Sequence, residues 1–221
     1  MTNDCRLTTN IMRHLILGDI HGQHEALIRV LKKADYDPNG DSLYCVGDLT
    51  DRGPDSARVL DFCIKHGVLS VRGNHDMWFL DYLIRGHAPM IWLSQGGYET
   101  LSSWHQESLF RKEVLDYYQK MPYYRELHLG GLSIAVFHGG ITPGVPLKDQ
   151  DTEVLTWDRY FWVFEQDPKL PYDRYFLGHT ALRGSAEKNK YNVINLDTGA
   201  GYNRILTAMD MVTLDKYEVN V

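Results

Sequence analysis

The chain has few cysteines, no long run of basic residues and no apolar run long enough to cross a bilayer. The cysteines Cys5, Cys45 and Cys63 show neither metal-binding nor disulfide spacing. Cys45 and Cys63 lie in apolar segments, so both are expected to be small buried hydrophobes. The basic residues are scattered and the net charge is −6, which argues against a nucleic-acid or membrane partner.

The first apolar stretch is interrupted by Arg13 and His14 and ends at Asp19, which makes it too short for a signal-peptide core. A soluble, cytoplasmic protein is therefore expected, as a monomer or a weak homo-oligomer. With 43% hydrophobic and 24% charged residues, residues 1–221 suit a single domain. The polar residues 1–12 are expected to form a flexible tail.

The first half of the chain alternates strand, loop and helix. Strands are expected at 15–17, 42–46 and 68–71, with helices at 24–34, at 54–66 and from about residue 74. This alternation predicts a sheet with parallel members. Residues 77–121 are expected to form an aromatic-rich helical insertion. Its rings either fill a core under a small cap or, in part, line a substrate groove.

The second half of the chain is predicted to consist mainly of strands. A hairpin is expected from 123–129 and 132–137, followed by strands at 174–177, 191–196 and 205–212. The chain is therefore expected to be an α/β protein with two sheets packed face to face and helices outside.

Five short polar motifs follow apolar stretches. They are Gly18–Gly22 (GDIHG), Gly47–Gly53 (GDLTDRG), Arg72–Asp76 (RGNHD), Phe137–Gly140 (FHGG) and Leu177–Thr180 (LGHT). Ligands of parallel sheets bind at the carboxyl ends of the strands, where these motifs fall. Their nitrogen and oxygen donors include no thiolate, which favours Mn²⁺, Fe or Zn²⁺ over a cysteine-type zinc site. Two such ions can generate hydroxide at neutral pH, while arginines hold phosphate oxygens. This is chemistry for in-line hydrolysis of a phosphoester.

Together the five motifs resemble those of the phosphoprotein phosphatase family of calcineurin-like metallophosphoesterases. In size and layout the chain is similar to the compact phage and bacterial serine/threonine protein phosphatases of that family. The resemblance implies two mixed β-sheets packed as a sandwich flanked by helices. It also implies two divalent metal ions, with Mn²⁺ favoured. By this resemblance Asp19, His21 and Asp48 hold one ion, and Asp48, Asn74, His138 and His179 hold the other, so that Asp48 bridges the two.

The resemblance also implies roles outside the metal ligands. His75 corresponds to the general acid, and Asp51 to the carboxylate that orients it. Arg52 and Arg72 correspond to ligands of the substrate phosphate. Arg159 lies where small members carry a further phosphate-binding arginine, and the alternative is a surface arginine beside Asp158.

The expected function is hydrolysis of phosphoserine or phosphothreonine in proteins by a hydroxide between two metals, with phosphotyrosine also considered. The alternative is a dinucleoside polyphosphate hydrolase of the same fold. Asp76 favours the dinucleoside polyphosphate hydrolase, because protein-directed members mostly have Glu at this position. The intact Asp51–Arg52 pair favours the protein phosphatase instead. A catalytically inactive binding relative is a third reading, which the complete ligand set disfavours.

Overall fold

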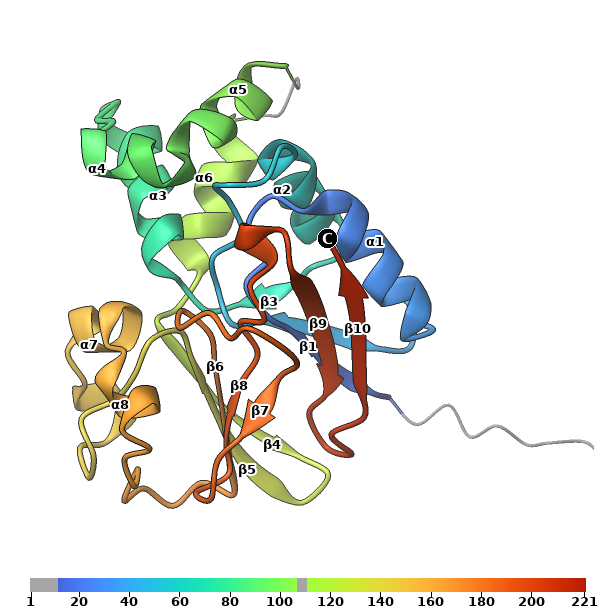
Figure 1. Ribbon diagram of the computed structural model, residues 1–221, viewed down its shortest axis with the longest axis vertical. Coiled ribbons are helices and arrows are strands. Elements are labelled where there is room, and N and C mark those ends of the chain that lie inside the picture. The colour runs from blue at the N-terminus through green and yellow to red at the C-terminus, as the bar shows by residue number, and fades with distance from the viewer. Residues whose placement is uncertain (1–11, 107–110) are drawn as a thin grey trace, which may run out of the picture.

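The computed structural model describes residues 12–106 and 111–221, so all but the last residue of the expected tail 1–12 lies outside the described residues. Two five-stranded sheets form the centre of the molecule, with strand orders β10-β9-β1-β2-β3 and β4-β5-β6-β8-β7. Figure 1 shows the sheets side by side with helices around them. The predicted α/β arrangement of two packed mixed sheets is confirmed.

In the first sheet, β1 (His14–Leu17), β2 (Ser42–Cys45) and β3 (Leu69–Ser70) are parallel, while β9 (Ile205–Asp210) pairs antiparallel with β1 on one side and with β10 (Lys216–Asn220) on the other. The helices α1 (His24–Lys33) and α2 (Ser56–Lys65) connect the parallel strands. The buried residues of α1 recur at helical spacing, namely Ala26, Leu27, Val30 and Leu31. This apolar face packs into the core cluster that also contains Leu15 and Leu43.

In the second sheet, β5 (Leu132–Phe137), β6 (Arg174–Leu177) and β8 (Val193–Asn195) are parallel, while β4 (Tyr124–Leu129) and β7 (Glu187–Lys188) are antiparallel edges. The short helices α7 (Thr152–Trp157) and α8 (Tyr160–Val163) cover its outer face. The two sheets share an apolar layer in which Ile16 and Val46 pack with Val136, Phe176 and Ile194.

The expected helical insertion is present. It consists of α3 (Asn74–Arg85), α4 (Met90–Trp92), η1 (Leu93–Gly97), α5 (Tyr98–Gln106) and α6 (Arg111–Lys120). A kink at Gln95 and Gly96 lies inside η1 and separates the helical segments on either side of it. Within the described residues, no helix is both long and apolar enough to cross a membrane.

The elements that the sequence prediction lacks are the α-helices α7 and α8, the strands β7 and β10, and two short 3₁₀ helices, η2 (Leu147–Asp149) and η3 (Ala200–Tyr202). Strand β7 is only two residues long and exposed, and β10 is mostly half-buried, so neither has the apolar run by which strands are recognised. The two α-helices are only four to six residues long and lie in a stretch rich in Pro and Asp.

Candidate metal and phosphate site

The five motifs meet at one edge of the two sheets. Asp19 follows β1, Asp48 follows β2, Asn74 begins α3 just after β3, His138 follows β5 and His179 follows β6. All five side chains belong to buried residues. Because these strands are parallel within their sheets, their carboxyl ends bring the two halves of the site together.

Three histidines direct one ring nitrogen into this site and bond the other to a backbone carbonyl. Nδ1 of His21 donates to the carbonyl oxygen of Thr50 at 2.9 Å, and Nδ1 of His138 donates to that of Val46 at 2.8 Å. His179 uses its other nitrogen, with Nε2 donating to the carbonyl oxygen of Trp157 at 3.1 Å. A hydrogen bond from one ring nitrogen leaves the lone pair of the other available to a metal.

Asp48 lies at the centre of the site. Its Oδ2 atom is 3.5 Å from Nε2 of His21 on one side and 3.3 Å from Nε2 of His138 on the other. Two groups of potential ligand atoms therefore share this carboxylate. They are His21, Asp48 and His75, and Asp48, His138 and His179, with ligand atoms within 4.8 Å of one another in each group.

The carboxylate of Asp19 fits a bound cation best. Its Oδ2 atom accepts a hydrogen bond from the backbone N–H of His179 at 3.1 Å, whereas its buried Oδ1 atom has no partner among the described residues. Burial and the nearby charges of Asp197 and Asp48 raise the pKa of Asp19 well above its ordinary value. Buried carboxylates that repel one another suit a site designed for a divalent cation.

The ring nitrogens of the second group converge on one amide oxygen. Oδ1 of Asn74 lies 3.1 Å from Nε2 of His138 and 2.9 Å from Nδ1 of His179. Burial lowers the pKa of His138, but the Asp48 and Asp19 carboxylates outweigh it and raise this pKa to about 10. Burial, with His138 and Arg159, lowers the pKa of His179 to about 2.

Asp76 supports the site from behind. Its carboxylate accepts hydrogen bonds from the backbone N–H groups of Asp48 (2.8 Å), Leu49 (3.0 Å) and Gly73 (2.9 Å), and Tyr118 donates at 3.3 Å. The residue is fully buried and faces the backbone of the Asp48 loop. Asp76, which is shorter than the Glu of protein-directed members, therefore holds that loop in place. Its identity is a weak indicator of whether the substrate is a protein or a dinucleoside polyphosphate.

His75 is fixed by Asp51. Nδ1 of His75 lies 2.6 Å from Oδ2 of Asp51, and both residues are buried. The same carboxylate accepts hydrogen bonds from the indole of Trp92 (2.8 Å) and the hydroxyl of Thr100 (2.6 Å). Neither Trp92 nor Thr100 was predicted as a site residue. The only signal was the Gly96–Gly97 pair between them.

Arg52 lies at the mouth of the site. Its guanidinium donates to Nε2 of His21 at 2.8 Å and to Nε2 of His75 at 3.0 Å, and it stacks over the ring of Tyr202. A cationic fork thus lies where an anionic substrate would meet both histidines.

The other two predicted arginines are placed differently. The guanidinium of Arg72 donates to the carbonyl oxygens of Tyr118 (2.6 Å) and Met121 (2.9 Å) and stacks over the ring of Tyr123. Arg159 is exposed and donates to the carbonyl oxygen of His179 at 2.6 Å. Arg159 therefore borders the second ligand group, while Arg72 faces the base of α6.

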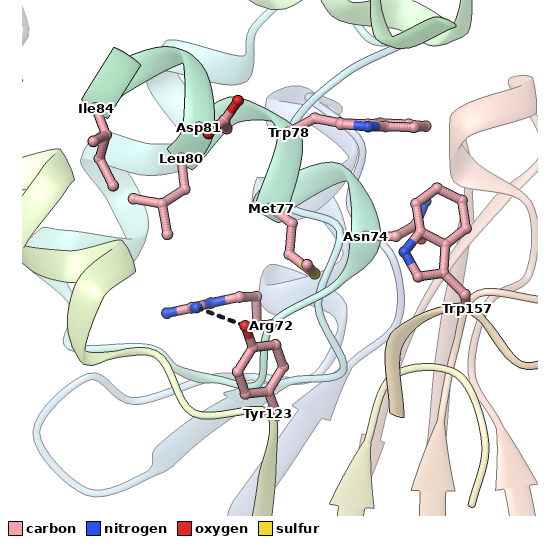
Figure 2. Close-up of a pocket in the computed structure, with 9 residues that line it drawn as sticks. All are labelled: Arg72, Asn74, Met77, Trp78, Leu80, Asp81, Ile84, Tyr123 and Trp157. Carbon is pink, nitrogen blue, oxygen red and sulfur yellow. Dashed lines mark hydrogen bonds between the residues drawn. The ribbon is translucent and has the colours of Figure 1, made fainter. Parts of the chain in front are cut away.

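A cleft of about 350 Å³ adjoins Asn74. Figure 2 shows Trp78 and Trp157 on its upper and right sides and Arg72 with Tyr123 at its base. The two indoles pack edge to face with their ring centroids 5.1 Å apart, and Trp78 also packs edge to face with the ring of His75 at a centroid distance of 5.0 Å. Aromatic side chains therefore line a path from His75 into the cleft. Trp78 is thus an aromatic residue of the insertion that borders this cleft.

The profile of the calcineurin-like phosphoesterase family matches residues 12–219. The chain belongs to this family. Phosphoesterases of this family bind divalent metals, and the His and Asp groups described above are placed for such a site.

Relatives of this phosphoesterase carry two kinds of name. Serine/threonine-protein phosphatase 1 of Salmonella typhimurium is 30% identical over 91% of this chain and 94% of its own length. A symmetrical bis(5'-nucleosyl)-tetraphosphatase of Paracidovorax citrulli is 34% identical, but over 58% of this chain and 44% of its own length. The crystal structure of a candidate diadenosine tetraphosphatase superimposes with a TM-score of 0.72 at 25% identity, covering 95% of this chain and 94% of the other.

Proposed function

We propose that this phosphoesterase is a metal-dependent phosphoprotein phosphatase that hydrolyses phosphoserine and phosphothreonine monoesters. The observation that carries the proposal is the charge around the site. Among the described residues, the lining of the cavity beside Asn74 pairs Asp81 with Arg72, and that of the cavity beside Arg52 pairs Glu99 with this arginine. Neither cavity therefore offers the surplus of positive charge that a polyphosphate chain needs, whereas a single phosphate needs only the metals and Arg52.

The shape of the cleft also supports this proposal. Its mainly apolar lining includes Met77, Trp78 and Trp157, and such a surface suits the side chains that flank a phosphorylated residue in a peptide. The full-length similarity to a protein named as a serine/threonine phosphatase adds support. The names of other relatives keep dinucleoside polyphosphates as the competing substrate class.

We propose two divalent cations, with Mn²⁺ preferred, because the donors are nitrogen and oxygen atoms without thiolate. Asp19, His21 and Asp48 would hold one, and Asp48, Asn74, His138 and His179 the other. When bound, such cations supply the Lewis acidity that activates water and neutralises phosphate charge. The unpartnered Oδ1 atom of Asp19 and the converging ring nitrogens fit this requirement.

The protein's own residues supply the remaining steps. The guanidinium of Arg52 leaves its hydrogen bond with His75 and binds two phosphate oxygens. Nε2 of His75 is then free to hold a proton, which it donates to the leaving oxygen of serine or threonine. Asp51 holds Nδ1 of the same ring and stabilises the charged imidazolium. Arg159 is proposed as a further phosphate ligand because it borders His179.

A substrate comparison tests the proposal. Metal-stripped protein is reconstituted with Mn²⁺, its metal content is measured, and it is assayed with a phosphoserine peptide, a phosphotyrosine peptide and diadenosine tetraphosphate. We expect the highest kcat/KM with the phosphoserine peptide. Faster release of ADP from diadenosine tetraphosphate would instead assign the nucleotide activity. A lack of turnover with every substrate and metal would indicate an inactive relative.

A further inference from the structure

The carboxylate of Asp51 is held by the helical insertion as well as by its own loop. Asp51 has no exposed surface. Trp92 donates its indole N–H to Oδ2 at 2.8 Å, and Thr100 donates its hydroxyl to Oδ1 at 2.6 Å. Because Oδ2 also accepts the Nδ1–H of His75 at 2.6 Å, these donors restrict the rotation of the carboxylate that orients the imidazole.

The hydroxyl of Thr100 also holds the backbone. It accepts a hydrogen bond from the N–H of Asp51 at 2.8 Å and lies 3.0 Å from the hydroxyl of Ser56, which itself accepts from the same N–H at 3.1 Å. Asp51 and Arg52 both have positive φ, 74° and 68°. Residues other than glycine keep such a conformation only where surrounding contacts fix it. Thr100 and Ser56 provide these contacts.

Two adjacent glycines allow the insertion to come this close. A β-carbon at Gly96 would lie 2.3 Å from the backbone nitrogen of Arg52, and one at Gly97 would lie 2.7 Å from the indole of Trp92. The φ of Gly96 is 110°, a conformation that side chains disfavour. The segment from Trp92 to Thr100 is thus built to reach Asp51.

We propose that Trp92 and Thr100 are positioning residues, which act through Asp51 to keep His75 aligned with the leaving oxygen. This inference rests on the proposed function, in which His75 donates a proton to that oxygen. A small displacement of a proton donor lowers the rate sharply, and the loss is greatest where the leaving group needs that proton most. The insertion therefore contributes to the chemical step as well as to the walls of the cleft.

The test compares leaving groups. Trp92→Phe removes the N–H and keeps most of the ring, and Thr100→Val removes the hydroxyl with little change of shape. Each variant is assayed with p-nitrophenyl phosphate, whose leaving group needs little protonation, and with a phosphoserine peptide. We expect kcat with the peptide to fall about 10- to 100-fold, a much smaller fall with p-nitrophenyl phosphate, and unchanged metal content. His75→Asn should show the same asymmetry with a larger loss.

Trp104→Phe is the matched control. Trp104 lies in the same insertion, but it packs against Phe79, with the ring centroids 5.5 Å apart, and not against Asp51. Its replacement should therefore leave the ratio of the two activities unchanged. If His75→Asn loses both activities equally, the general-acid role in the proposed function is wrong. If His75→Asn is asymmetric while both Trp92→Phe and Thr100→Val lose the two activities equally, or lose neither, the positioning inference is wrong.

Discussion

Gly73 leaves no room for a side chain against Asp48. A methyl group on this residue would lie 2.1 Å from Oδ1 of Asp48 and 2.6 Å from its backbone nitrogen. Gly73 has φ −91° and ψ 171°, so alanine can adopt the backbone conformation and the conflict is purely steric. Since ordinary contact requires at least 3.4 Å, the carboxylate in Gly73→Ala must retreat by ~1.3 Å.

A retreat of about 1 Å by a group in the reacting centre costs about 100-fold in rate. Overpacking costs about 1–3 kcal/mol, which corresponds to a fall in Tm of about 2–4 °C for each kcal/mol in a domain of this size. For Gly73→Ala we therefore expect kcat/KM with p-nitrophenyl phosphate to fall about 100-fold, together with weaker Mn²⁺ binding and a Tm lower by several degrees.

Gly184→Ala is the control, because a β-carbon there meets no atom within 4 Å. Steady-state kinetics, titration calorimetry with Mn²⁺ and differential scanning calorimetry would be run on both variants. Full activity and undiminished Mn²⁺ affinity in Gly73→Ala would refute the close approach of α3 to Asp48.

Three further outcomes are expected. Asp48→Asn should weaken metal binding in both ligand groups, because one carboxylate faces both, and an unchanged metal stoichiometry would contradict the sharing. Burial opposes the fall in the pKa of Asp41, but the hydrogen bonds from Arg13 outweigh it and lower that pKa. The resulting stability is present above the ordinary carboxyl pKa and is lost as the pH falls through the lowered value. Asp41→Asn should therefore cost about 1–2 kcal/mol at pH 7 in urea unfolding, and equal stabilities at neutral pH would refute the ion pair. Cys45 and Cys63 are buried, and burial raises their pKa values, so mass spectrometry should find both labelled by a thiol reagent only after denaturation.

The sequence located the site because its signal is local. Asp48 and His138 each follow an apolar strand within a short polar motif, and the parallel order of the strands brings such positions to one edge. The contacts of Trp92 and Thr100 with Asp51 span 41 and 49 residues, and no periodic pattern encodes a contact over that distance. The sequence alone predicts that a tryptophan is buried, but not where its N–H points.

The edge strand β10 illustrates a second limit of prediction. Its side chains are mostly half-buried, and few of them are apolar. The strand is defined by its antiparallel pairing with β9, which runs from Lys216 opposite Met209 to Asn220 opposite Ile205. The direction of Arg72 was equally inaccessible, because it depends on carbonyl groups at the end of α6.

The two sheets contribute different halves of the ligand set. His21 and Asp48 follow strands of the first sheet, and His138 and His179 follow strands of the second. A cation bound by both halves would join them as a non-covalent cross-link across the apolar layer. Its binding free energy would then add to folding stability, by about 2.7 kcal/mol at a concentration 100 times Kd. Metal supply would thus affect the fraction of chains that stay folded as well as the rate of turnover.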